Sequence, residues 1–192
     1  MLPELAQDII DRLSEKGITL EKGLTNDEIS QAEQKFDLEF PPDLKLLLQT
    51  ALPISDAFVN WRLGLTSEEE EKKILNRISW PLEGMLFDIR SNDFWDDRWG
   101  PKPDNDRDQI EIVWKHYQTY PRLIPIYSHR YISSKPSLSD NPVFSIYQMD
   151  IIYYGFSLAS YFIREFDLSL TVPYKPRIAP EREIEFWSDW VG

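Results

Sequence analysis

Four short segments between residues 123 and 154 constrain the fold of this chain more than any other feature. Each is rich in β-branched and aromatic residues and is separated from the next by turn formers, which is the pattern of β-strands. The segments are residues 123–127, 130–133, 143–148 and 151–154. Because residues 133–142 form the long connection and Gly155 ends the last segment, we expect a long hairpin or a meander.

The chain before these strands has helical periodicity. Apolar residues from Leu5 to Leu13 recur at helical spacing. Thr25 and Glu28 form a capping box that begins a second helix, and the pair at 41–42, Pro41-Pro42, presets the first turn of a third, which Pro53 is expected to end.

A fourth helix is expected to begin at Ser67, where the capping-box pattern recurs with Glu70, and to end before Pro81. Residues 85–89 then have the pattern of a short strand. Later helices are expected after Asp106, after Ser157 and at about residues 180–191, the last of them rich in tryptophan.

Helices that come first and strands that cluster later are typical of an α+β fold rather than of an alternating parallel one. The 192 residues are 42% hydrophobic, which suffices for one sizeable core. We therefore expect a single domain that spans residues 1–192.

The composition restricts the cellular setting. The absence of cysteine excludes disulfides, thiolate metal sites and a cysteine nucleophile. The first residues have no basic region followed by an apolar run, and no stretch approaches the ~20 apolar residues that span a bilayer. We expect a cytoplasmic protein without a membrane partner.

The net charge of −12 opposes nucleic-acid binding, because binding to the phosphate backbone depends on clustered Lys and Arg. A basic partner protein is favoured by the same electrostatic field. An acidic surface also keeps a protein soluble without any partner, so the charge alone leaves both interpretations open.

Motifs for metals and cofactors do not reach their required patterns. Asp104, Asp106 and Asp108 begin like a calcium loop, but Gln109 and Lys115 occupy the positions that need Gly and a bidentate Glu. The two histidines, His116 and His129, lie in different predicted elements without carboxylates at zinc-ligand spacing, and glycine-rich phosphate motifs are absent. We expect neither a metal nor a cofactor.

Residues 84–103 hold the densest chemistry in the chain. Two tryptophans and a phenylalanine alternate there with four aspartates and two arginines, which is a composition typical of a recognition surface. Asp96 and Asp97 could act as an acid–base pair if burial separated their pKa values, but ion pairs at a surface loop fit equally well with arginines nearby.

Tryptophans fall into two predicted groups. Trp114 and Trp187, with Tyr117 and Phe162, lie at the spacing of buried helix faces, so we expect them to pack in the core. Trp61, Trp95 and Trp99 lie in predicted loops among charges. Because interface anchors are often Trp, Tyr and Arg, a binding role is expected for this second group.

Three blocks of the sequence resemble the SUKH superfamily, which includes the fungal cell-wall assembly regulators of the Smi/Knr type and many bacterial immunity proteins. The blocks cover residues 23–47, 84–103 and 121–155. The most specific motifs are Phe94-Trp95-x-x-x-Trp99-Gly100-Pro101 and Asn141-Pro142-Val143-Phe144-Ser145. The resemblance extends over about residues 23–166 and leaves out the first and last predicted helices.

This resemblance implies an α+β fold with helices packed on one side of a mainly antiparallel sheet. It also implies a non-enzymatic role, because the bacterial members resemble immunity proteins that bind and neutralise a toxin from a polymorphic or contact-dependent system. It supplies no catalytic residues.

Our first hypothesis is therefore a cytoplasmic immunity protein whose acidic and aromatic surface covers a toxin domain, such as a basic nuclease. The candidate partner-binding residues are Trp61, Asp88, Asp93, Trp95, Asp96, Arg98 and Trp99, with His129, Tyr131 and Tyr153 as possible neighbours. The alternative is a regulatory scaffold of cell-wall assembly or signalling that binds proteins or a small ligand in a pocket. A hydrolase would need a close, buried carboxylate pair. The oligomeric state, monomer or dimer, stays open.

Overall fold

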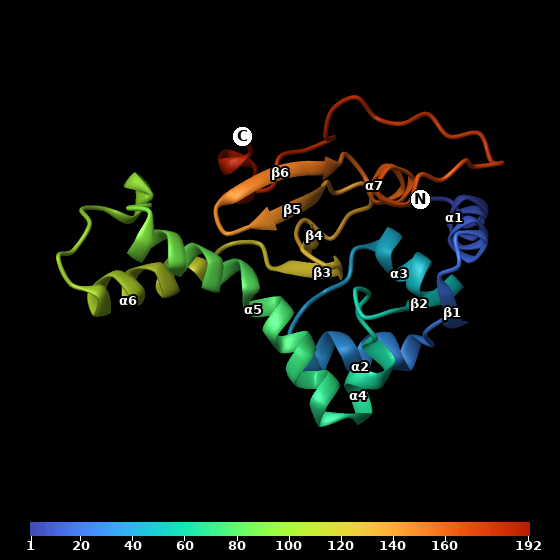
Figure 1. Ribbon diagram of the computed structural model, residues 1–192, viewed down its shortest axis with the longest axis horizontal. Helices are drawn as coiled ribbons and strands as arrows, with labels where there is room; N and C mark the ends of the chain where they lie inside the picture. Colours follow the sequence, from blue (N-terminus) through green and yellow to red (C-terminus); the bar gives the residue numbers. More distant parts are fainter.

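A four-stranded antiparallel sheet lies at the centre of the computed structural model, which describes residues 1–192 (Figure 1). Its strands are β3 (Leu123–Tyr127), β4 (Arg130–Ser133), β5 (Val143–Tyr147) and β6 (Asp150–Gly155), and they are neighbours in sequence order. All four predicted strands are confirmed, and the sheet is a meander.

Both faces of this sheet are covered, because successive strand residues point to opposite sides. Ile124, Ile132 and Val143 join a core cluster with the helices α1 (Pro3–Glu15), α2 (Asn26–Phe36), α3 (Pro42–Thr50) and α7 (Leu158–Phe166). Tyr131 and Phe144, next to them in sequence, join a second cluster with α5 (Glu68–Ser91), α6 (Asp106–Tyr117) and the C-terminal segment. The predicted α+β class is confirmed. The helices, however, pack against both faces of the sheet and not on one side only.

The helices are α1 (Pro3–Glu15), α2 (Asn26–Phe36), α3 (Pro42–Thr50), α4 (Trp61–Thr66), α5 (Glu68–Ser91), α6 (Asp106–Tyr117) and α7 (Leu158–Phe166), with short 3₁₀ helices η1 (Asp97–Trp99) and η2 (Trp187–Trp190). The predicted caps are confirmed, since Thr25, Ser67 and Ser157 each accept a backbone N–H of the first turn, but the capping box expected at Ser67 lacks the reciprocal bond to Glu70. No helix is both long enough and apolar enough to span a bilayer.

The predicted C-terminal helix at residues 180–191 is wrong. Only η2 is helical there, and it begins after Phe186, whose φ of 67° lies in the left-handed region. A left-handed residue interrupts the repeated right-handed conformation that a helix requires. The segment instead consists of bends, a turn and η2, forms a single bridge from Val191 to Ile151 of β6, and buries Ile184, Phe186 and Trp187.

A second, two-stranded sheet was not predicted. It pairs β1 (Thr19–Lys22) with β2 (Ala51–Ile54) in antiparallel register. β1 is largely exposed and lacks alternating apolar residues, so it has no strand pattern in the sequence. Pro53, which we expected only to end a helix, lies inside β2.

The most consequential difference is helix α5, which continues through Pro81 to Ser91. We expected Pro81 to end it and residues 85–89 to form a strand. Proline removes the N–H that would bond the carbonyl four residues earlier, here that of Arg77. The Tyr131 hydroxyl donates to this Arg77 carbonyl at 2.9 Å. The carbonyl therefore keeps a hydrogen-bond partner although the helix bond is missing.

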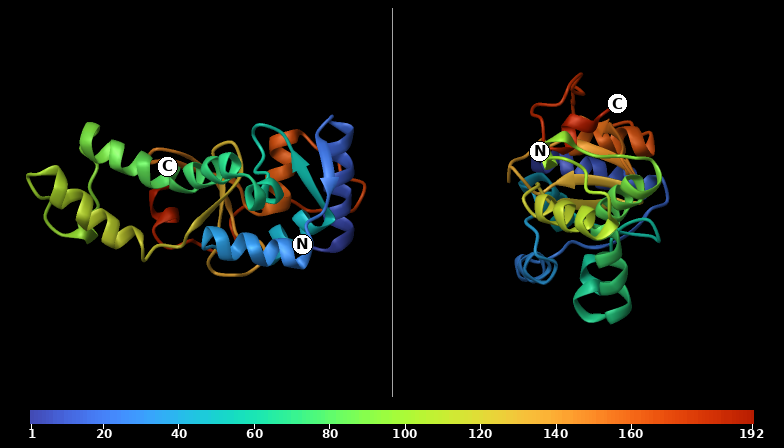
Figure 2. Two further views of the ribbon diagram at one scale, coloured as in Figure 1. Left: turned by 90° about the horizontal axis from the view of Figure 1, so that it is seen from below. Right: turned by 90° about the vertical axis from the view of Figure 1, so that its left-hand side faces the viewer.

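The 24 residues of α5 make a helix about 36 Å long. Figures 1 and 2 show that its C-terminal half and α6 form the end of the molecule that lies away from α1. Gly84, in this half, packs against Gln148 of the β5–β6 turn.

Candidate functional site

Asp88, the first candidate of the motif at 84–103, is a buried residue of α5. One carboxylate oxygen accepts the Met149 N–H at 2.7 Å, and the other accepts the side-chain amide of Asn92. Gly84, one turn earlier, lies so close to Gln148 that a Cβ would stand 2.7 Å from the Gln148 Cα. Asp88 and Gly84 therefore fix the β5–β6 turn against α5.

Asp96 is also buried and forms an ion pair with Arg98, with 2.6 Å between Oδ2 and Nη2. Burial opposes ionisation of Asp96, but the hydrogen bonds from Arg98 outweigh it and lower the pKa of this carboxyl. Arg98 also pairs with Asp189 of η2. The two aspartates thus hold the C-terminal segment, and Asp97, which is exposed, forms no buried pair with Asp96.

The candidate tryptophans serve packing. Trp61 is the first residue of α4 and is buried between Phe36 and Phe40, so its predicted place in a loop is wrong. Trp99 is buried and donates to the Tyr120 hydroxyl at 2.6 Å. Trp95 is half-buried and donates to the Gly100 carbonyl.

Trp114 contradicts its prediction in the opposite direction. We expected it in the core, but its side chain is 51% exposed on the outer face of α6. The buried face of α6 contains Gln109 and Val113, which leaves Trp114 outside it.

The remaining candidates lie apart from one another. Asp93 is exposed and pairs with Lys102, which lowers its pKa. Tyr153 is half-buried and stacks on Phe144 in the cluster beneath the C-terminal segment. His129 and Tyr131 line a groove on another part of the molecule. The ten candidates therefore do not form one surface.

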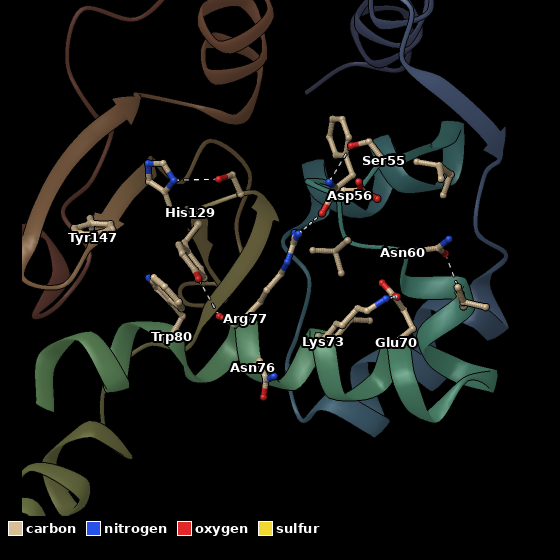
Figure 3. Close-up of a pocket in the computed structure, with 17 residues that line it drawn as sticks. Ser55, Asp56, Asn60, Glu70, Lys73, Asn76, Arg77, Trp80, His129 and Tyr147 are labelled. Atoms are coloured by element: carbon tan, nitrogen blue, oxygen red, sulfur yellow. Dashed lines mark hydrogen bonds and ion pairs between the residues drawn. The ribbon is translucent and has the colours of Figure 1, made fainter. Parts of the chain in front are cut away.

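That groove has a volume of about 760 Å³ and lies between α5, residues 54–60 and the β3–β4 turn (Figure 3). Its floor and walls include apolar, charged and aromatic side chains. They are Ile54, Phe58, Val59 and Ile74; Asp56, Glu70, Lys73 and Arg77; and Trp80, His129, Tyr131 and Tyr147. An open groove with an apolar floor and convergent polar groups is the common form of a binding site.

Arg77 organises the centre of the groove. Its two terminal nitrogens donate to the carbonyls of Ala57 and Asp56, each at 2.6 Å, while its own carbonyl accepts from Tyr131. One residue of α5 therefore fixes both the loop at 54–60 and the sheet. No carboxylate forms an ion pair with its guanidinium.

The two ends of the groove differ in charge and in ring content. At one end Lys73 pairs with Glu69 and Glu70, so its charge is neutralised. At the other end His129, Trp80 and Tyr147 lie together (Figure 3), with Trp80 45% and Tyr147 59% exposed. Such exposed large aromatic rings are typical of interface anchors.

His129 faces this aromatic end from the β3–β4 turn. Its Nδ1 lies 3.1 Å from the Ser128 hydroxyl. Burial lowers the pKa of His129, and the neighbouring Arg130 lowers it further, against a smaller opposing effect of Glu165. The lowered pKa favours the neutral imidazole, which can stack or share a hydrogen bond without repelling a cation.

Sequence reasoning missed Arg77 and Trp80. Glu70, Lys73, Arg77 and Trp80 recur at helical spacing and so share one face of α5. The residues after the expected helix end at Pro81 were predicted as the site, and this face was not.

No group of three or more His, Asp or Glu side chains is arranged to hold a metal ion. Comparison with known proteins finds no matching family, no similar curated protein and no similar solved structure.

Proposed function

We propose that this chain is a non-enzymatic binding protein that neutralises a toxin domain, as the immunity proteins of the SUKH superfamily do. The observation that carries the proposal is the groove beside α5, because it combines an apolar floor with two exposed aromatic rings at its rim. This arrangement suits insertion of a partner segment. The proposal places the protein in the cytoplasm, where an incoming toxin would act.

Charge supports a basic partner. The formal net charge is −12, and exposed carboxylates gather on α6 and the loop before it, at Asp97, Asp104, Asp106, Asp108 and Glu111. A surface of this sign attracts a cationic domain, such as a nuclease, and accelerates its encounter. Of the nearby cations, Arg98 and Lys102 are already paired with aspartates, and the exposed carboxylates outnumber the two unpaired cations of α6, Arg107 and Lys115.

A second candidate function is a regulatory scaffold that binds a small ligand or a cellular protein. The concave shape of the groove and its convergent polar groups favour this alternative over a flat contact surface. Both candidates use the same site, so they differ in the partner rather than in the binding surface.

A neutralisation assay separates these candidates. The C-terminal domain encoded by the gene beside this one is expressed in a bacterial host, alone and together with the present chain. We expect growth to stop with the domain alone and to resume with co-expression, while an unrelated acidic protein gives no protection. A harmless domain, or a toxic one that the chain does not neutralise, would contradict the immunity proposal. The regulatory scaffold would then be the remaining candidate function.

A further inference from the structure

The geometry points to a specific ligand for the aromatic end of the groove: we propose that it binds an arginine or lysine side chain carried by an extended peptide segment. This inference rests on the proposed function, since it names the part of a basic partner that the groove takes.

Two exposed aromatic rings form this end of the groove. Trp80 comes from α5 and Tyr147 from the end of β5, and both line the groove with about half of their surface exposed. Figure 3 shows them at the same end as His129. A cation over the face of a Trp or Tyr ring is attracted by the ring quadrupole, most strongly over Trp.

Unpaired carboxylates lie near these rings. Glu83 follows Trp80 at i+3 on α5, and Asp150 lies directly opposite Tyr147 in the β5–β6 hairpin. Both are exposed, as is Asp56, which lies on the other side of Arg77 from the rings (Figure 3). None of them forms an ion pair within the protein, unlike Glu69 and Glu70 at the other end. The negative charge at the aromatic end is thus available to a ligand.

Arg77 explains why the cation belongs to a peptide and not to a small free cation. Its guanidinium lies in the groove without a carboxylate partner and is bound to two backbone carbonyls. The positive guanidinium repels a second cation on the floor of the groove, but it can donate hydrogen bonds to further carbonyl oxygens there. A peptide meets both conditions, because its backbone carbonyls can lie near Arg77 while a basic side chain reaches the rim.

The size of the groove agrees with this ligand. Its α5 wall extends from Glu70 to Trp80, which is about 15 Å along a helix. An extended peptide rises about 3.3 Å per residue, so four to five residues occupy that length. The apolar floor at Ile54, Phe58 and Ile74 would contact the side chains that flank the basic residue.

A peptide titration of the full chain tests the inference without any toxin. Three blocked peptides are used: acetyl-Gly-Leu-Arg-Leu-Gly-amide, the same peptide with neutral citrulline for arginine, and the same with glutamate. Binding is followed by the tryptophan indole N–H signals in ¹H–¹⁵N NMR spectra. We expect the arginine peptide to bind about three-fold more tightly than the citrulline peptide, and the glutamate peptide to bind more weakly than both.

Two sets of variants keep the result specific. Trp80→Leu should weaken binding of the arginine peptide about five-fold, whereas Trp114→Leu, a substitution of another exposed helix tryptophan, should not change it. The double variant Glu83→Gln and Asp150→Asn should reduce the difference in affinity between the arginine and citrulline peptides, and the rings should retain the remaining preference for arginine.

Equal binding of the arginine and citrulline peptides, tighter binding of the glutamate peptide, or no shift with any of them at millimolar concentration would overturn the inference. Its failure is distinguishable from failure of the proposed function. Neutralisation without peptide binding would place the partner elsewhere on the surface. Peptide binding without neutralisation would support the peptide site but contradict the proposal that the partner is a toxin.

Discussion

At the scale of single residues, Tyr131 and Pro81 explain how the groove is built. Pro81 frees the carbonyl of Arg77, and the Tyr131 hydroxyl satisfies it from β4. The same tyrosine is only 1% exposed, and burial raises its pKa above the usual range. A residue that we expected near the partner therefore acts inside the protein, where it joins the sheet to α5.

Replacing Tyr131 with Phe should lower the free energy of unfolding by about 1 to 3 kcal/mol, because the Arg77 carbonyl would lose its partner in a buried setting. Urea denaturation measures this as a lower midpoint with an unchanged slope. The matched control is Tyr147→Phe, whose ring is 59% exposed and which should change stability by less than about 0.5 kcal/mol. Equal stability of the two variants would show that the hydroxyl does not support α5.

At the scale of elements, local sequence rules predicted the features that depend on neighbouring residues, namely helix caps and strands. The capping box at Thr25, the cap at Ser157 and all four strands of the meander are formed as expected. The rule for proline failed at Pro81 because the missing hydrogen bond is replaced from β4, some 50 residues later in the chain, which no window of neighbouring residues contains.

The motif at 84–103 failed as a single surface for a related reason. Its composition predicted a recognition surface, but the interactions described for its aspartates are made within the protein. Asp88 accepts the Met149 N–H and Asp96 pairs with Arg98, so these carboxylates are bound to other segments of the same chain. The groove combines α5, residues 54–60 and two turns of the sheet, and spacing along the sequence could not bring these segments together.

Docking of the β5–β6 turn on α5 should depend on Asp88. In Asp88→Ala, the Met149 N–H loses its acceptor, and we expect the free energy of unfolding to fall by about 1.5 to 3 kcal/mol, as for hydrogen bonds to charged groups. Hydrogen exchange of the Met149 amide should accelerate more than that of β4 amides. Asp93→Ala, which removes a nearby exposed carboxylate, should leave both quantities nearly unchanged; similar losses in the two variants would contradict this role.

At the scale of the whole molecule, α5 connects two surfaces with different chemistry. Its first half forms a wall of the groove, and its second half leads to the acidic end with α6. Each surface presents one exposed tryptophan, Trp80 in the groove and Trp114 on α6. We assign the binding anchor to Trp80, because this ring lines the groove, and we assign to the acidic end the attraction of a basic partner over longer distances.

The most direct test of this account is the dissociation constant of the purified toxin domain for the native chain, Trp80→Ala and Trp114→Ala, measured by calorimetry on variants whose circular dichroism is native. An anchor in a binding site contributes at least about 2 kcal/mol, so Trp80→Ala should weaken binding about 30-fold. Trp114→Ala should leave the dissociation constant within two-fold of the native value. Native affinity in Trp80→Ala together with weak binding in Trp114→Ala would place the partner on α6 and contradict the account.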